Sequence, residues 1–281
     1  MSATRLEGRP IAVARQQEIA AQVEALRASG CQPRLAVVMA TQDEAGLSYF
    51  RSKKRLAEKL GIVVDAVRPP EETTGGLASC VEDLAADPGV HGIMIETPLP
   101  DGIDLEALRG RLPAGKDVDG AGIESLGRLL AGRSGFAPAT AEAVIALLDG
   151  HGIPLAGKRV AVIGRSLVVG RPLSLLLLSR NATVTVCHSK TIDLPAHTRA
   201  ADIVVVAVGR AGFLTGDLVG KDVVVVDVGT NWNGEKLVGD TDFESVSGVA
   251  AALSPVPGGV GPLTTTLLME HVVRAAAQRN A

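Results

Sequence analysis

The stretch from Lys158 to Leu178, KRVAVIGRSLVVGRPLSLLLL, changes its pattern twice within one short span. Arg159 to Ile163 is a β-branched run typical of a strand, Gly164 to Gly170 is a glycine-bounded turn, and the leucines after Pro172 are typical of a helix. Free N–H groups at the start of a helix can bind a phosphate. The spacing differs from G-x-G-x-x-G, because Ser166 replaces the second glycine and the third comes one residue late. The stretch therefore predicts either a phosphate-binding turn or an ordinary buried strand-to-helix turn.

The residues after the next predicted strand favour a nucleotide site. This strand, Thr183 to Cys187, is followed directly by His188, and an NAD site would usually have an acidic residue there for the ribose hydroxyl. Arg165, Ser189 and Lys190 instead offer hydrogen-bond donors and positive charge. These groups suit a ribose 2′-phosphate, so the sequence favours NADP over NAD.

Two further apolar runs predict strands of the same sheet. Residues 203–208 (IVVVAV) and 223–228 (VVVVDV) are continuously apolar, which is typical of strands with helices on both faces. Each run ends at a glycine, Gly209 or Gly229, where a backbone can approach a ligand closely. Four such strands separated by helix-length segments predict a doubly wound, Rossmann-type parallel α/β domain.

The first part of the chain predicts a second α/β domain. Strand and helix patterns alternate there and end at Pro98, and a last helix is predicted from Leu263 to Arg279. We expect an N-terminal domain of residues 1–140, with the final helix 263–281 packing back on it, and a nucleotide domain of residues 141–262. The strand patterns lie at residues 34–40, 62–67 and 91–96, and the helical patterns at 11–27, 44–60 and 76–86.

Composition excludes several classes of protein. The chain has 281 residues, of which 46% are hydrophobic and 2% aromatic, and its net charge is −3. It therefore lacks the positive charge and the stacking surface expected of a nucleic-acid-binding protein. Cys31, Cys80 and Cys187 are widely spaced, which favours reduced thiols and no metal site. With no apolar segment typical of a signal or membrane span, we expect a cytoplasmic protein.

Lys53 is the first candidate for chemistry. It shares one face of the predicted helix 44–60 with Tyr49, Leu56 and Leu60, because positions 49, 53, 56 and 60 are separated by four, three and four residues. The lysine either extends past this face to water or is partly buried beside the only tyrosine. In the second case it could bind an anion or move a proton.

Three carboxylates are further candidates. Asp117 and Asp119, in KDVDG, are either turn formers or ligand-binding groups. Glu96 ends a predicted strand, where ligands of α/β sheets bind, but an exposed carboxylate is an equally good interpretation.

Taken together, the motifs of this chain resemble the methylenetetrahydrofolate dehydrogenase/cyclohydrolase family. They occur in the family's order over nearly the whole chain, and KDVDG with the proline-glycine loop is the most specific combination. The motifs are Ser48-Tyr49 with Lys53, Pro98-Leu99-Pro100, Lys116 to Gly120, Gly164-Arg165-Ser166 with Val169-Gly170, Cys187-His188-Ser189 with Thr191, Asp227-Val228-Gly229 with Asn231, and Pro255 to Pro262.

The resemblance implies a homodimeric enzyme that binds tetrahydrofolate derivatives in the cleft between its two domains. It would oxidise 5,10-methylenetetrahydrofolate with NADP, and bifunctional members then hydrolyse the methenyl product to 10-formyltetrahydrofolate. Lys53 would be the central acid/base or charge-stabilising group, Tyr49 would stack on the folate, and Asp119 would hold the pterin. The other implied substrate-binding residues are Ser48, Pro257, Gly258 and Gly259. The implied cofactor-binding residues are Gly164, Arg165, Ser166, Gly170, His188, Ser189, Gly209 and Thr230.

The chain departs from the family pattern at the lysine's partner. Family members generally have glutamine where this chain has Glu96, and a carboxylate beside Lys53 would favour its charged form and weaken it as a base. We therefore expect dehydrogenation to be retained and cyclohydrolase activity to be reduced or absent. The alternatives are a monofunctional dehydrogenase, a non-catalytic folate- or nucleotide-binding paralogue, and an enzyme resembling shikimate dehydrogenase.

Overall fold

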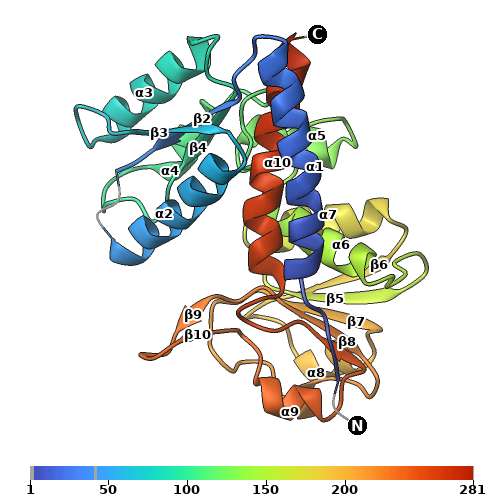
Figure 1. The fold of residues 1–281 in the computed structure, drawn as a ribbon. Coiled ribbons are helices and arrows are strands. Elements are labelled where there is room, and N and C mark those ends of the chain that lie inside the picture. Colours follow the sequence, from blue (N-terminus) through green and yellow to red (C-terminus); the bar gives the residue numbers. More distant parts are fainter. Residues whose placement is uncertain (1–2, 41–42, 281) are drawn as a thin grey trace. The chain divides into compact units, whose positions relative to one another are not determined.

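The computed structural model describes residues 3–40 and 43–280 (Figure 1). The chain divides into two compact units: Met1–Val13 with Thr140–Thr264, and Ala14–Ala139 with Thr265–Ala281. We call them the six-stranded unit and the three-stranded unit after their main sheets. Residues up to Val13 group with the six-stranded unit because β1 pairs with β11, a pairing that the sequence pattern did not suggest. No helix in the described part of the chain is long and apolar enough to cross a membrane.

The six-stranded sheet is parallel and has the order β1-β11-β8-β7-β5-β6. Strand β5 has β6 on one side and β7 on the other, so the strand order reverses there. This confirms the predicted doubly wound fold, in which ligands bind at such a reversal, at the carboxyl ends of the strands. The strands are β1 (Thr4–Arg5), β5 (Arg159–Ile163), β6 (Thr183–Cys187), β7 (Ile203–Val206), β8 (Val224–Asp227) and β11 (Ala252–Leu253).

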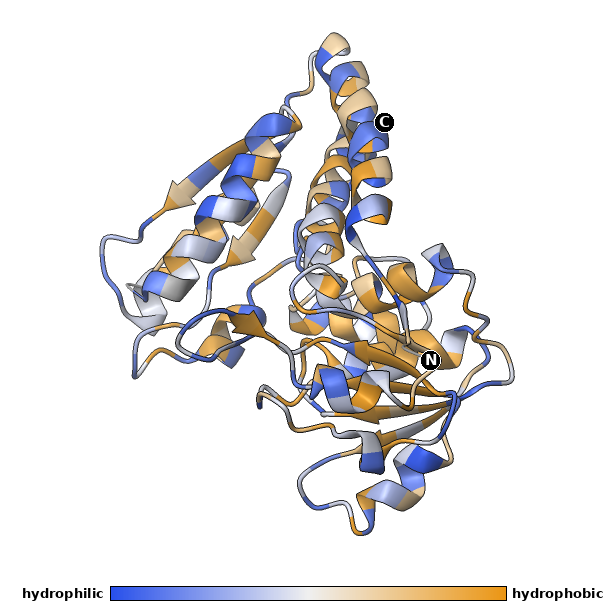
Figure 2. Ribbon diagram, turned by 60° about the horizontal axis from the view of Figure 1, so that its bottom comes forward, coloured by the Kyte–Doolittle hydropathy of each residue, from blue (hydrophilic) through white to orange (hydrophobic). Residues whose placement is uncertain are grey.

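Both faces of this sheet are buried at strands β5, β7 and β8. Along β5, the alternating residues Val160 and Val162 are as buried as Ala161 and Ile163, although they point to opposite faces. Figure 2 shows the same strands coloured as hydrophobic along most of their length. The remaining elements of the unit are α6 (Ala139–Gly150), α7 (Gly170–Ser179), α8 (Leu194–Arg199), η1 (Gly216–Leu218), β9 (Asn231–Trp232), β10 (Leu237–Val238) and α9 (Phe243–Ser247).

The three-stranded sheet is also parallel, with β2 between β3 and β4. Its strands and the helices of its unit follow the predicted alternation. They are α1 (Arg9–Ala28), β2 (Arg34–Val38), α2 (Glu44–Lys59), β3 (Val63–Val67), α3 (Thr74–Ala86), β4 (Gly92–Ile95), α4 (Leu105–Arg109), α5 (Ile123–Leu130) and α10 (Val260–Asn280).

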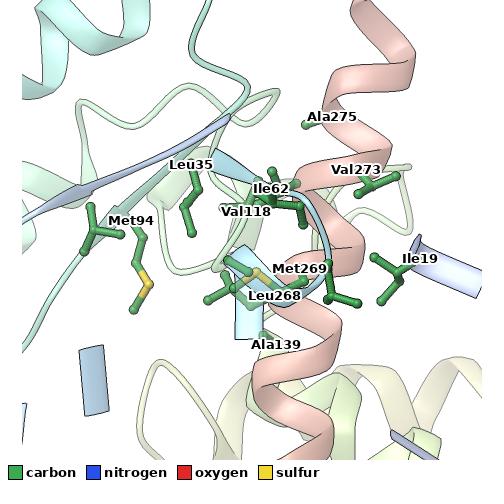
Figure 3. Packing of buried hydrophobic residues seen from close by; sticks show 14 of the residues in the cluster. Ile19, Leu35, Ile62, Met94, Val118, Ala139, Leu268, Met269, Val273 and Ala275 are labelled. Atoms are coloured by element: carbon green, nitrogen blue, oxygen red, sulfur yellow. The ribbon is translucent and has the colours of Figure 1, made fainter. Parts of the chain in front are cut away.

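The alternation of side chains along β2 divides the core of this unit in two. Leu35 and Val37 join a cluster with Leu268 and Val272 of α10, whereas Ala36 and Val38 join a second cluster that includes residues of α3. Figure 3 shows the first cluster gathered around α10. The final helix therefore packs on the N-terminal α/β sheet, as the sequence predicted.

Candidate active site

Lys53 lies on the buried face of α2. This face consists of Phe50, Lys53, Ala57 and Leu60, at spacings of three, four and three, and Lys53 is only 6% exposed. The side chain therefore does not extend to water. The predicted stripe is slightly rotated, because Tyr49 at its edge is 44% exposed.

The ammonium group of Lys53 forms a buried ion pair with Glu96. Nζ lies 2.9 Å from Oε1 and 2.8 Å from Oε2 of Glu96, which follows β4 directly and is 3% exposed. The same Nζ lies 5.0 Å from the centre of the Tyr49 ring, a distance typical of a cation–π contact. Glu96 is therefore not an exposed carboxylate but the direct partner of the lysine.

The electrostatics of this cluster are coupled. Burial raises the pKa of the Glu96 carboxyl, the Lys53 ammonium opposes this effect, and Asp119 adds to it. The pKa of Asp119 is likewise raised by burial and lowered in part by Lys53. Burial, Glu96 and Asp119 all raise the pKa of the Tyr49 hydroxyl. The ammonium group of Lys53 thus acts on both carboxylates, with His271 and Arg109 also lowering the pKa of Asp119, an arrangement suited to holding or moving a proton.

The two aspartates of KDVDG have different surroundings. The fully buried Asp117 accepts hydrogen bonds from the N–H groups of Ala121 (3.3 Å) and Gly122 (2.8 Å), so it is a turn former. At Gly120, with φ of 68°, an added Cβ would lie 2.4 Å from the carbonyl of Ala137, so only glycine fits. This turn fixes the loop at Asp119, which acts electrostatically on Tyr49 and Glu96.

In the six-stranded unit, the glycine turn joins β5 to α7. Gly164 has φ of 124°, and a Cβ on it would lie 2.2 Å from the carbonyl oxygen of Ala207. A Cβ on Gly170 would lie 2.0 Å from the carbonyl oxygen of Gly164. Ser166, in the place of the second glycine, is exposed, and its Oγ accepts a hydrogen bond from the N–H of Val169 at 3.1 Å. Both glycines are thus required sterically, and the exposed Arg165 and Ser166 lie between them.

The ends of β5 and β6 bring the predicted phosphate contacts to one edge of the sheet. Ile163 pairs with Cys187, so Arg165 and Ser189 each follow one of two neighbouring strand ends, and both are exposed. The loop is held by hydrogen bonds from the N–H of His188 to Thr191 Oγ1 (2.8 Å) and from the N–H of Lys190 to the Nδ1 atom of His188. This loop has no acidic side chain between Cys187 and Thr191.

Most of the remaining candidates lie at loops, and Ser48 lies on a helix. Gly209 and Thr230 are exposed after β7 and β8, and Ser48 is exposed on α2. Pro257 is exposed, and the N–H of Gly259 closes the proline-glycine loop on the carbonyl of Pro255 at 2.8 Å. The three-stranded unit thus brings together Lys53, Tyr49, Glu96 and Asp119, and the six-stranded unit carries the candidate cofactor contacts. No cluster of three or more metal-ligating side chains occurs in residues 3–40 and 43–280.

Two buried aspartates of the six-stranded unit had no predicted role of their own. Asp227 is 3% exposed and Asp240 is fully buried. Asp227 is the one acidic residue in its apolar strand, and Asp240 follows a glycine. Asp227 could have been identified from the sequence, because it is a carboxylate in a run of residues that should be buried on both faces of the sheet.

Comparisons with known proteins give a consistent result. Residues 6–119 match the family described as tetrahydrofolate dehydrogenase/cyclohydrolase, catalytic domain, and residues 138–280 match its NAD(P)-binding domain. The bifunctional protein FolD of Nocardia farcinica is 51% identical over 98% of both chains. FolD 1 of Paenarthrobacter aurescens is also 51% identical, over 100% of this chain and 96% of its own length.

Solved structures show the same similarity. The bifunctional FolD enzyme of Campylobacter jejuni has a TM-score of 0.94 at 39% identity and covers 99% of this chain and 100% of its own. The Trypanosoma brucei enzyme, complexed with NADP cofactor and inhibitor, has a TM-score of 0.92 at 34% identity, over 99% of this chain and 98% of its own. Shikimate 5-dehydrogenase of Thermus thermophilus, at 18% identity and a TM-score of 0.50 over 88% of this chain and 98% of its own, shares only the fold.

Proposed function

Because this chain belongs to the tetrahydrofolate dehydrogenase/cyclohydrolase family, we propose that it oxidises 5,10-methylenetetrahydrofolate to 5,10-methenyltetrahydrofolate with NADP. The observation that carries the proposal is the buried ammonium group of Lys53, 2.8 Å from Glu96 and 5.0 Å from the Tyr49 ring. A positive charge held beside an aromatic ring and two carboxylates suits a substrate whose reacting nitrogens must be oriented and whose charge changes during the reaction.

On the substrate side, Lys53 is the central charge-stabilising or proton-moving group. Tyr49, partly exposed beside it, offers a ring on which the folate can stack, and Asp119 offers an acceptor for the N–H groups of the pterin. Ser48 and the proline-glycine loop, Pro257 to Gly259, complete the proposed folate contacts. The proposed folate domain comprises residues 1–140 with 263–281, and the cofactor domain residues 141–262.

The residues of the six-stranded unit fit NADP. Gly164 and Gly170 let the turn after β5 close tightly against Ala207 and against itself, which is the kind of tight turn that a dinucleotide site needs. Arg165 and Ser189, with no acidic residue between Cys187 and Thr191, suit the 2′-phosphate. Ser166, His188, Gly209 and Thr230 are the other proposed contacts. When bound, the nicotinamide supplies the hydride acceptor.

Spectrophotometry of the purified protein tests this proposal. NADPH absorbance should rise when methylenetetrahydrofolate is added with NADP, and the rate should fall by about 100-fold or more in Lys53→Met, because the positive charge beside the substrate is lost. If no NADPH forms although both ligands bind, the chain is a non-catalytic paralogue and the proposal fails.

The ion pair also supports a second proposal, that hydrolysis of the methenyl product is slow in this enzyme. Lysine accepts a proton only as the neutral amine, and a neutral Lys53 would leave the buried Glu96 carboxylate without its ammonium partner. Hydride transfer depends chiefly on the positions of two bound rings and does not need that neutral amine.

The assembly that we propose is a homodimer, as the family resemblance implies. The chain mass is 28.9 kDa. Light scattering after size-exclusion chromatography should give about twice this mass, and a monomer mass at micromolar concentration would contradict the proposal.

A further inference from the structure

The carboxylate of Asp240 gathers N–H groups from two loops of the six-stranded unit. Its Oδ2 accepts hydrogen bonds from the backbone N–H of Val208 (2.6 Å) and Gly209 (2.9 Å), and its Oδ1 from the N–H of Arg210 (2.8 Å). Oδ1 also accepts a hydrogen bond from the side-chain amide of Asn231 at 2.9 Å. One buried carboxylate therefore holds the loop after β7 and the start of the hairpin after β8.

A second buried carboxylate fixes Asp240 itself. Asp227, the last residue of β8, accepts hydrogen bonds from the N–H groups of Asp240 (3.0 Å), Thr241 (2.8 Å) and Gly229 (2.8 Å). A Cβ on Gly239 would lie 2.0 Å from Oδ2 of Asp227, so this approach requires glycine. The two aspartates thus form one network anchored on a strand of the sheet.

The hydrogen bonds of Asp240 determine where the carbonyl groups of the loop point. The peptide bonds from Ala207 to Arg210 are trans, so each carbonyl points away from the N–H of its own peptide group. With three successive N–H groups directed at Asp240, the carbonyls of Ala207, Val208 and Gly209 are directed away from it. The Ala207 oxygen accordingly lies against Gly164 of the glycine turn.

In this orientation the loop can accept hydrogen bonds from a ligand but cannot donate them. Its N–H groups are occupied and cannot bind a phosphate, whereas the carbonyls of the half-buried Val208 and the exposed Gly209 remain as acceptors. Ribose hydroxyls and carboxamide N–H groups are suitable donors.

We propose that Asp240 is a positioning residue, which orients the loop after β7 as an acceptor surface for the nicotinamide half of NADP. This inference rests on the proposed function. The strand order β6-β5-β7-β8 supports it: with the 2′-phosphate at the end of β6 and the pyrophosphate at the turn after β5, the other half of the cofactor extends over β7 and β8. Asp240 touches no ligand and acts through Val208 and Gly209.

Calorimetric binding of NADP and of adenosine 2′,5′-bisphosphate, which lacks the nicotinamide half, tests the proposal. In Asp240→Asn, an amide N–H group replaces one acceptor oxygen and faces the loop N–H groups. NADP should bind about tenfold or more weakly, whereas the bisphosphate should bind as it does to the wild type. The KM for NADP should rise, and the KM for methylenetetrahydrofolate should stay within about twofold.

The neighbouring Asp242→Asn is the matched control. Asp242 caps α9 by accepting the N–H of Ser245 at 3.2 Å, so its replacement should leave both affinities unchanged. Arg165→Gln should weaken both ligands together. An equal loss of both ligands in Asp240→Asn, or no loss of either, would overturn the positioning role. Failure of the wild-type protein to bind NADP at all would instead contradict the proposed function.

Discussion

At the scale of single residues, the buried ion pair between Lys53 and Glu96 determines how readily Lys53 can lose its proton. Glutamine at position 96 would keep one acceptor for the Lys53 ammonium but remove the negative charge. We therefore expect Glu96→Gln to raise the rate of methenyltetrahydrofolate hydrolysis by about tenfold or more, because a neutral Lys53 would no longer leave a buried carboxylate unpaired. Loss of the methenyl absorbance measures this rate.

The control for this variant is Glu82→Gln, which alters an exposed partner of Arg111. It should hydrolyse the methenyl compound at the wild-type rate. If wild type already hydrolyses it far above the buffer rate, and Glu96→Gln adds nothing, the ion pair does not limit hydrolysis.

Removing the lysine should make stability depend on pH. The ammonium lowers the pKa of Glu96 against the effect of burial, so in Lys53→Met this pKa rises further above its ordinary 4.5. A carboxyl group with a raised folded-state pKa contributes stability below its unfolded pKa and loses it as the pH rises through the folded pKa. The variant should therefore lose roughly 3–5 kcal/mol near pH 8 and clearly less near pH 4.5.

Urea unfolding at both pH values gives these free energies. The double variant Lys53→Met/Glu96→Gln has no carboxylate to leave unpaired, so its deficit should change little with pH. If Lys53→Met loses the same free energy of unfolding at both pH values, an unpaired Glu96 carboxylate is not the cause of the loss.

At the scale of elements, the turn between β5 and α7 combines two constraints on one glycine. Gly164→Ala would place a Cβ in strained backbone at φ 124° and 2.2 Å from the carbonyl of Ala207. We expect a loss of about 2–4 kcal/mol in the free energy of unfolding and weaker NADP binding, because the turn must move. Gly157, with φ of 76° and open space around it, is the control.

Gly157→Ala should lose only about 1 kcal/mol and bind NADP as the wild type does. Chemical denaturation and calorimetry measure both effects. If the two alanine variants behave alike, the close approach of Ala207 is not what requires glycine at position 164.

Elements whose pattern lies in their own residues could be predicted from the sequence, and elements that depend on distant residues could not. The apolar runs at β5, β7 and β8 and the amphipathic pattern of α2 identify those elements directly, because the positions of their apolar residues match the faces that are buried. The short α8 and α9 and the hairpin β9–β10 were not predicted, since helices of five or six residues and strands of two carry too little pattern. β1 was missed because its two residues are a strand only through pairing with β11.

The candidate site was predictable to a similar degree. The helical stripe marked Lys53 and the strand end marked Glu96, but their ion pair depends on the register of α2 against β4, which no local pattern specifies. Asp240 was missed because its partners, residues 208–210, are distant in sequence. Local pattern thus identified the reactive groups, and tertiary structure decided which groups they contact.

At the scale of the whole molecule, the last helix contributes to the same hydrophobic core as residues near the start of the chain. Leu268 on α10 is 3% exposed and belongs to the cluster that contains Leu35 of β2 and Ile19 of α1 (Figure 3). Leu268→Ala should therefore leave a cavity in the three-stranded unit and lower its free energy of unfolding by about 2–5 kcal/mol. Leu130, 71% exposed on α5, is the matched control and should lose no more than about 0.5 kcal/mol as alanine.

Native-state hydrogen exchange can assign this loss to one part of the chain. Protection should fall along β2 and α10 in Leu268→Ala, because both contribute to the cavity wall, and it should be unchanged in Leu130→Ala. Equal protection in the two variants would mean that α10 is not integral to this core. A loss of protection confined to Leu268→Ala would show that α10 stabilises the three-stranded sheet, against which α2 and its Lys53 pack. Truncation of α10 would then disturb the proposed folate site without altering any of its residues.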